Sequence, residues 1–208
     1  MTDTLANAIS NLVTTLQGWC SIEKALEMAR LILEKHPTNV VEIGVFGGRS
    51  LIPQALALRE NGKGIIYGID SWHTVDTLEG NLSDADKTWW RDNVDLNGIH
   101  AGCMTAVWAA GVDAHCIIIR AASQHVPKLF PGGIDILHVD GCHSEESSVR
   151  DLNLYLPQMK RDGLVWFDDS SWPTTQKALG VLRETYVELR KVDDCILFQR
   201  KYDKQTKV

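Results

Sequence analysis

The stretch that decides the fold runs from Asn39 to Ser50 and reads NVVEIGVFGGRS. Its first half, Asn39 to Gly44, is a short apolar run typical of a buried strand. A glycine-rich turn follows, and residues from about Ser50 to Glu60 favour a helix, with Pro53 early enough for its missing N–H to be tolerated. A strand, a tight glycine turn and a helix in this order indicate the opening unit of an α/β fold.

Four similar apolar runs follow at residues 65–70, 115–120, 134–140 and 164–168. Continuous apolar runs suit parallel strands that are covered on both faces. Helices are predicted over 145–160 and 174–189, and residues 186–200 alternate around an Asp-Asp turn as an antiparallel hairpin does. We therefore predict an α/β fold: a Rossmann-like, doubly wound sheet of seven strands, mostly parallel with an antiparallel C-terminal hairpin and helices on both faces.

The length of 208 residues fits one domain that spans residues 1–208. Residues 1–37 predict two helices, with Ser21 as the N-cap of the second. Residues 73–114 form the one long irregular segment between strands, and inserts of this kind often carry function. We expect this insert to form part of an acceptor site or a lid.

Composition excludes several classes of protein. The net charge of −6 argues against a nucleic-acid binder, which normally needs a basic face. No apolar run approaches the roughly 20 residues of a membrane span, and the N-terminus lacks the layout of a signal peptide. The five cysteines include no C-x-x-C pair, which favours reduced thiols in a cytoplasmic protein.

Polar residues gather at the predicted carboxyl ends of the strands, where open α/β sheets bind ligands. These residues include Asp70, Ser123, Asp140 and Asp168, besides the glycine-rich turn. Each residue taken alone could be an ordinary helix cap. The prediction of a ligand site therefore depends on the fact that all five loops carry such residues at the same edge. The turn is neither a dinucleotide fingerprint, because Val45 and Phe46 follow Gly44, nor a P-loop, because no Gly-Lys-Ser/Thr occurs.

Glu42, Gly44, Gly48 and Ser50 match the pattern E-x-G-x-x-x-G-x-S. This pattern resembles motif I of the class I S-adenosylmethionine-dependent methyltransferases, in the form found in catechol-type O-methyltransferases. The resemblance extends over about residues 38–200, and its most specific block runs from HVDGCH at 138–143 to DGLVWFDD at 162–169. That block is similar to small methyltransferase domains of macrolide tailoring and of bacterial glycan modification.

The resemblance implies S-adenosylmethionine as the cofactor, with Asp70 as the acid that binds the ribose hydroxyls. Trp72 lies two residues after this acid and could stack on adenine. The full set of donor-binding residues that we predict is Glu42, Gly44, Phe46, Gly48, Ser50, Asp70, Ser71, Trp72, Ser123, Gln124 and Asp140.

Asp140, Asp168 and Asp169 offer three carboxylates, the ligands that a hard cation prefers. By resemblance they match the Mg²⁺ ligands of catechol-type enzymes, although the last ligand there is usually Asn. The alternative is that Asp168 and Asp169 cap a helix while Asp140 orients the donor. His143 is the candidate general base, since an imidazole accepts a proton near neutrality and the macrolide-type group has a His here. Alternatively, His143 caps a helix or helps to bind the donor.

The seven tryptophans are many for this length. Trp89, Trp90 and Trp172 are candidate acceptor-binding residues, because aromatic faces pack well on sugars and planar rings. Trp108 lies in the same insert and could join them. The alternative is an insert that packs on the sheet or on a second subunit. Trp19 and Trp166 are predicted to be core residues.

The predicted function is S-adenosylmethionine-dependent O-methylation of a hydroxyl of a small molecule or a glycan sugar, assisted by Mg²⁺ and a His base. No nucleic-acid or membrane partner is expected, and a homodimer is a possible assembly. A nicotinamide-dependent reductase is disfavoured by the missing G-x-G-x-x-G and Tyr-x-x-x-Lys patterns. A non-catalytic module that binds a sugar or a partner protein remains the alternative.

Overall fold

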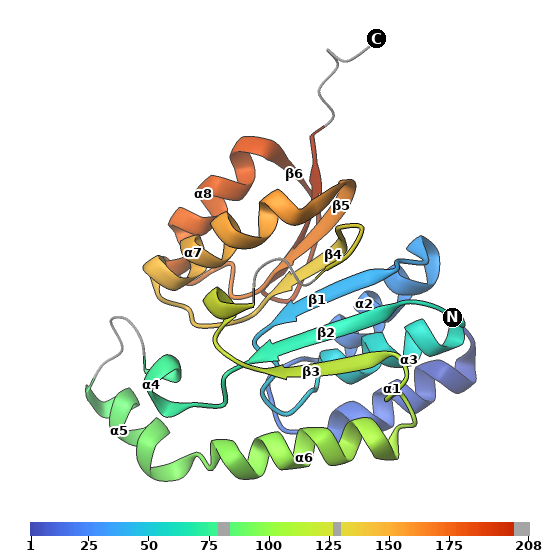
Figure 1. Ribbon diagram of the computed structural model, residues 1–208, viewed down its shortest axis with the longest axis horizontal. Helices are drawn as coiled ribbons and strands as arrows, with labels where there is room; N and C mark the ends of the chain where they lie inside the picture. Colours follow the sequence, from blue (N-terminus) through green and yellow to red (C-terminus); the bar gives the residue numbers. More distant parts are fainter. Residues whose placement is uncertain (79–83, 127–129, 202–208) are drawn as a thin grey trace.

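The computed structural model describes residues 1–78, 84–126 and 130–201, and residues 79–83 of the predicted insert lie outside this part (Figure 1). The strands form one sheet in the order β3-β2-β1-β4-β5-β7-β6. Their bounds are β1 Asn39–Ile43, β2 Ile65–Asp70, β3 Cys116–Arg120, β4 Ile134–Val139, β5 Met159–Phe167, β6 Tyr186–Val192 and β7 Cys195–Arg200. The first five strands run parallel, and β7 pairs antiparallel with both β5 and β6. The predicted fold class is confirmed.

Helices cover both faces of the sheet. Their bounds are α1 Asp3–Thr15, α2 Ile22–Lys35, α3 Leu51–Glu60, α4 Thr74–Thr77, α5 Asp84–Asn93, α6 Leu96–Ala109, α7 Glu145–Tyr155 and α8 Gln176–Thr185. One core cluster joins one face of the sheet to α1, α2, α3 and α6, and a second joins the other face to α7 and α8. Figure 1 shows α7 and α8 on one side of the strands and α1, α3 and α6 on the other.

Local signals account for most helix starts. The hydroxyl of Ser21 accepts the N–H of Lys24 at the start of α2, as the sequence predicts for this cap. Ser144 caps α7 and Asp95 caps α6 in the same way. Ser50 is different, because its side chain makes no capping hydrogen bond to α3 and binds Glu42 instead.

Two predicted boundaries are wrong. The helix predicted over 145–160 ends at Tyr155, because a 3-10 turn at Leu156–Gln158 contains Pro157 and β5 begins at Met159. The helix predicted to reach Leu189 ends at Thr185, because residues 186–192 pair with β7 as a strand. Long-range pairing decides both ends.

The predicted insert is more regular than its sequence indicates. Residues 96–109 of the insert form α6, which buries Leu96, Ile99, Cys103 and Val107 in the same core cluster as the N-terminal helices. These four residues form the apolar stripe of the helix. The stripe is hard to recognise in the sequence, because Gly98 and Gly102 lie between its residues along the chain and the opposite face of the helix is exposed. The arrowheads of β1, β2 and β3 point toward α4 and α5, so the insert lies beside the carboxyl ends of the strands (Figure 1).

Candidate functional site

A cleft of about 850 Å³ opens at the carboxyl ends of the strands. Its walls come from the loops after β1, β2, β3, β4 and β5, with further residues from the N-terminal segment, the insert and the β6–β7 turn. The strand order reverses direction between β1 and β4, and ligands of open α/β sheets bind at such a switch point. The predicted residues therefore converge on one edge, as expected.

Gly44 begins the turn after β1 and passes very close to the chain after β4. Its φ is +86°, and a Cβ at this position would lie 1.9 Å from the carbonyl oxygen of Asp140. Only glycine fits such a close backbone approach in the left-handed region. Phe46 and Gly48 also have positive φ, at 49° and 81°. The turn thus directs backbone N–H groups toward the end of β2.

Asp70 at the end of β2 holds this turn in place. One carboxylate oxygen accepts the N–H groups of Val45 and Phe46 at 3.0 and 2.9 Å, and the other accepts the N–H of Trp72 at 2.8 Å. Asp70 also lines the cleft, as do Ser71 and Phe46. A carboxylate has about four lone-pair sites, so Asp70 keeps capacity for a ligand hydroxyl.

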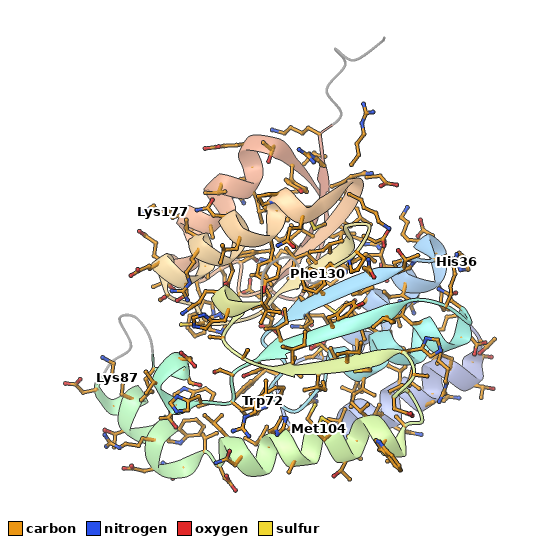
Figure 2. The ribbon with its side chains drawn as sticks, in the orientation of Figure 1. His36, Trp72, Lys87, Met104, Phe130 and Lys177 are labelled. Atoms are coloured by element: carbon orange, nitrogen blue, oxygen red, sulfur yellow. The ribbon has the colours of Figure 1, made fainter. Side chains whose placement is uncertain are left out.

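Trp72 does not lie on the cleft wall. Its side chain is 2% exposed and its ring packs 4.6 Å from the ring of His100 on α6. The indole N–H donates to the carbonyl of Phe46 at 2.9 Å, and Figure 2 shows Trp72 turned toward α6. The prediction that Trp72 stacks on adenine is therefore wrong: it supports the turn from the core.

Glu42 is likewise buried beneath the turn, at 0% exposure, and does not reach the cleft. It accepts hydrogen bonds from Ser50 Oγ and Gln54 Nε2, each at 2.7 Å, and its carboxylate lies 3.2 Å from His138 Nδ1. Glu42 and His138 are register partners on β1 and β4, which brings them together. The prediction that Glu42 contacts the donor is therefore corrected: Glu42 supports the turn from below. Ser50, in contrast, lines the cleft as predicted.

The other predicted donor residues divide in the same way. Ser123, after β3, lines the cleft, where its hydroxyl donates to Asp151 and its carbonyl accepts the hydroxyl of Tyr155. Gln124 and Gly48 do not belong to the cleft wall, and Gly48 packs against Cys103 and Ile52. Their predicted donor contacts stay predictions.

The adjacent residues Asp168 and Asp169 face different partners. Asp169 has a φ of 51°, which turns the chain between the two carboxylates. Asp168 is 6% exposed, forms a close ion pair with the buried Lys24 of α2, and lies 3.5 Å from His138 Nε2. Burial raises the pKa of Asp168, but His138 and Lys24 outweigh it and hold the pKa well below its ordinary value.

Asp169 instead joins His143 and Asp140. Ligand atoms of these three residues all lie within 4.8 Å of one another. His143 Nε2 lies 2.9 Å from an Asp169 carboxylate oxygen, and the Trp172 ring lies 4.9 Å from the imidazole. Burial lowers the pKa of His143, but Asp169 outweighs it and raises the pKa above 6.5. Burial and the charge of Asp168 raise the pKa of Asp140 to about 7.

A family model described as a methyltransferase domain matches residues 41–170, which is more than half of the chain. This chain belongs to the methyltransferase domain family. The predicted resemblance to class I methyltransferases is thereby confirmed. An uncharacterised protein of Acanthamoeba polyphaga mimivirus is 29% identical over 144 residues, which are 69% of this chain and 57% of that protein. The chain thus spans little more than half the length of this relative.

Solved methyltransferases share the fold. The Podospora anserina methyltransferase PaMTH1, bound to S-adenosylhomocysteine, has a TM-score of 0.68 at 15% identity, with 98% of this chain and 89% of that chain covered. The Bacillus cereus O-methyltransferase in complex with S-adenosylhomocysteine has a TM-score of 0.65 at 12% identity, covering 97% and 92%. Within the described residues, no helix combines the length and apolarity needed to cross a bilayer.

The three-aspartate site that the family resemblance implies for Mg²⁺ does not fit the arrangement of these side chains. Asp140 and Asp169 converge, but they do so with the imidazole of His143. The third carboxylate, Asp168, is already neutralised by Lys24. A hard cation prefers oxygen ligands, so a set that exchanges one carboxylate for a nitrogen is a poorer match for Mg²⁺.

Sequence reasoning missed Lys24. Helix α2 buries Lys24 in phase with Met28, Leu31 and Ile32. A lysine on the apolar stripe of an amphipathic helix was the signal that could have found it, because buried lysines need a partner.

One tryptophan prediction is wrong, because Trp19 lies beside the cleft and not in the core. Trp166 is in the core at 1% exposure, as predicted, but Trp19 is 71% exposed, because it lies in the segment that joins α1 to α2. The Trp19 ring lies 5.0 Å from Phe46 and 6.1 Å from Trp90, and Trp89 packs edge-on against Trp90. We call Trp19, Trp89 and Trp90 the aromatic wall, which meets the turn after β1 at Phe46. Trp108 does not line the cleft.

Proposed function

We propose that this protein transfers the methyl group of S-adenosylmethionine to a hydroxyl oxygen of a small molecule or a glycan sugar. The observation that carries the proposal is the pair His143–Asp169, in a cleft at the switch point of a methyltransferase-family sheet. The pair joins a proton acceptor to a carboxylate that orients it, the arrangement expected of a general base.

The donor would lie between the turn after β1 and the ends of β2 and β3. Gly44 allows a close backbone approach, while Asp70, Ser71 and Ser123 offer polar groups along this side. Eight aspartates line the cleft against three lysines and arginines. This excess of negative charge supports binding of a cationic sulfonium.

The acceptor would lie on the other side, between the aromatic wall and Trp172. Trp172 stands beside His143, so a ring packed on this indole would place its hydroxyl near the imidazole. Trp89, Trp90 and Trp172 all line the cleft, which supports their predicted role in acceptor binding. Aromatic faces suit both sugars and phenols, and the proposal therefore names both classes.

The chemistry assigns one role to each group. The acceptor oxygen attacks the methyl carbon in line with the C–S bond, which breaks with its electron pair left on sulfur as a neutral thioether. The acceptor proton passes to His143 Nδ1, because Nε2 already faces Asp169, and the Asp169 carboxylate stabilises the resulting imidazolium. The cleft walls supply orientation and exclude water, which is most of what a sulfonium donor requires. No step in this scheme is assigned to a metal ion.

The test combines calorimetric titration of S-adenosylhomocysteine with a methyl-transfer screen on sugars and phenols, using chelator-treated protein. We expect micromolar binding and transfer to at least one acceptor class. His143→Asn should keep binding but lose turnover by about 10²- to 10⁴-fold. The matched control is His125→Asn, an exposed histidine outside the cleft wall, which should behave as the unaltered protein.

Donor binding and the role of His143 are tested independently of each other. Absence of any S-adenosylhomocysteine binding would remove the donor site and favour the non-catalytic binding module. Full turnover in His143→Asn would leave the methyltransferase proposal standing but take the role of base away from His143.

A further inference from the structure

Lys24 places an ammonium group among the carboxylates at the ends of β4 and β5. Its Nζ forms a close ion pair with Asp168, and the two side chains are 8% and 6% exposed. Burial lowers the pKa of Lys24, but the charges of Asp140 and Asp168 outweigh it and raise the pKa above its ordinary value. Lys24 therefore pairs directly with one of the three residues that the family resemblance assigns to Mg²⁺, and it lines the same cleft as the other two.

The position of this ammonium is built into the fold. Ser21 caps α2 through the N–H of Lys24 at 3.0 Å, and the Ser21 hydroxyl also binds Asp193 in the β6–β7 turn. Just before this cap, the carbonyl of Gly18 accepts a hydrogen bond from Arg49 at 2.8 Å. The start of α2 is thus tied both to the turn after β1 and to the terminal hairpin.

A second buried group adds to the charge balance. His138 is 0% exposed and lies 3.2 Å from Glu42, 3.5 Å from Asp168 and 3.9 Å from Asp140. A divalent cation at Asp140 and Asp168 would have to displace Lys24 from Asp168 or lie close to its positive charge, and like charges repel strongly beside a buried group. Buried carboxylates need a partner, and here the chain itself provides one.

We propose that Lys24 is a positioning residue that takes the charge-balancing place of a divalent cation at Asp140 and Asp168, so that the site works without metal. The inference rests on the proposed methyltransferase function. Lys24 acts through Asp168, with which it pairs, and leaves Asp169 free to orient His143.

The experiment measures cation binding directly, by titrating Mn²⁺ into chelator-treated protein and counting free ion by electron paramagnetic resonance. The unaltered protein should bind no Mn²⁺ in the micromolar range. Lys24→Met removes the charge at similar length and should raise Mn²⁺ affinity by about tenfold or more. Lys24→Arg keeps the charge and should bind no more Mn²⁺ than the unaltered protein.

Lys24→Met leaves the buried carboxylate of Asp168 without its ammonium partner and could fail to fold. The double variant Lys24→Met/Asp168→Asn removes one charge of each sign and serves as the folded reference, with no gain in Mn²⁺ affinity expected. Micromolar Mn²⁺ binding by the unaltered protein overturns the proposal by itself, whatever the variants do. So does a folded Lys24→Met protein whose Mn²⁺ affinity is unchanged.

S-adenosylhomocysteine titration of the same samples separates this inference from the proposed function. Binding of the thioether without metal, together with no Mn²⁺ binding, supports both. Loss of all thioether binding in the unaltered protein refutes the methyltransferase proposal, whereas tight Mn²⁺ binding with intact thioether binding refutes only the role of Lys24.

Discussion

The two sides of the cleft are built in opposite ways. On the side of the turn after β1, a carboxylate fixes backbone N–H groups, and the side chains below it, Glu42 and Trp72, are buried. On the side of the aromatic wall, Trp19 and Trp89 are 71% and 50% exposed and contact mainly other rings.

This difference matches two different demands. The methyl donor is the same molecule in every turnover, and a rigid backbone held from beneath suits a ligand that never changes. An acceptor ring is held by packing against faces, which tolerates variation in the ligand. We therefore expect substitutions on the first side to affect stability, and substitutions on the second side to affect acceptor affinity.

Gly44→Ala should have the largest effect. The added Cβ would meet the Asp140 carbonyl at 1.9 Å in a backbone with φ +86°, so we expect destabilisation above about 4 kcal/mol or failure to fold. Gly62→Ala is the matched control, since its φ is +68° but nothing lies within 4 Å of the new Cβ. That change should cost about 1–2 kcal/mol in a urea melt. Equal costs at both positions would contradict the close approach.

Glu42→Ala tests whether the buried acid supports the turn or contacts the donor. Because it leaves Ser50, Gln54 and His138 without their partner, unfolding free energy should fall by about 3–5 kcal/mol. The folded fraction should keep its affinity for S-adenosylhomocysteine. The exposed Glu60→Ala should stay within about 0.5 kcal/mol. A Glu42→Ala protein that keeps its stability but no longer binds S-adenosylhomocysteine would instead support direct contact between Glu42 and the donor.

The pH dependence of turnover sharpens the role of the pair at the centre of the cleft. The pKa of His143 is raised, so below that pKa the base is protonated and turnover should rise about tenfold per pH unit, to a plateau above it. Stability should change in the opposite sense: the stabilisation by protonated His143 is present below about pH 6.5 and is lost as pH rises through the folded-state pKa. A flat rate profile from pH 5 to 9 would exclude His143 as the base.

Trp90→Ala should have the smallest effect on the fold and a selective effect on the acceptor. Loss of its ring should raise the acceptor KM by about tenfold while donor affinity changes little. Trp108→Ala is the matched control, because Trp108 lies on the outer face of α6 at 76% exposure. This change should alter neither the acceptor KM nor the affinity for the donor. Equal effects of the two variants would remove the aromatic wall from acceptor binding.

The sequence by itself determined the sheet and the family. Apolar runs and glycine-rich turns are local signals, because each reflects the burial and backbone conformation of a few consecutive residues. They located all seven strands, and they placed Asp70, Asp140, Asp168 and His143 at one edge, since parallel strands end on the same side. Helix ends near Tyr155 and Thr185 were missed, because distant strand pairing decides them.

Only the tertiary structure decided which side chains face the cleft and which support it from below. Trp72 lies in the core because α6 covers it, and no local sequence pattern predicts its contact with His100. Asp168 and Asp169 are neighbours in the chain, but a positive φ separates them, and a lysine 144 residues away pairs with the first of them. Charge balance in a buried site depends on every element that packs there, which is why the partner of Asp168 emerges only when the chain is folded.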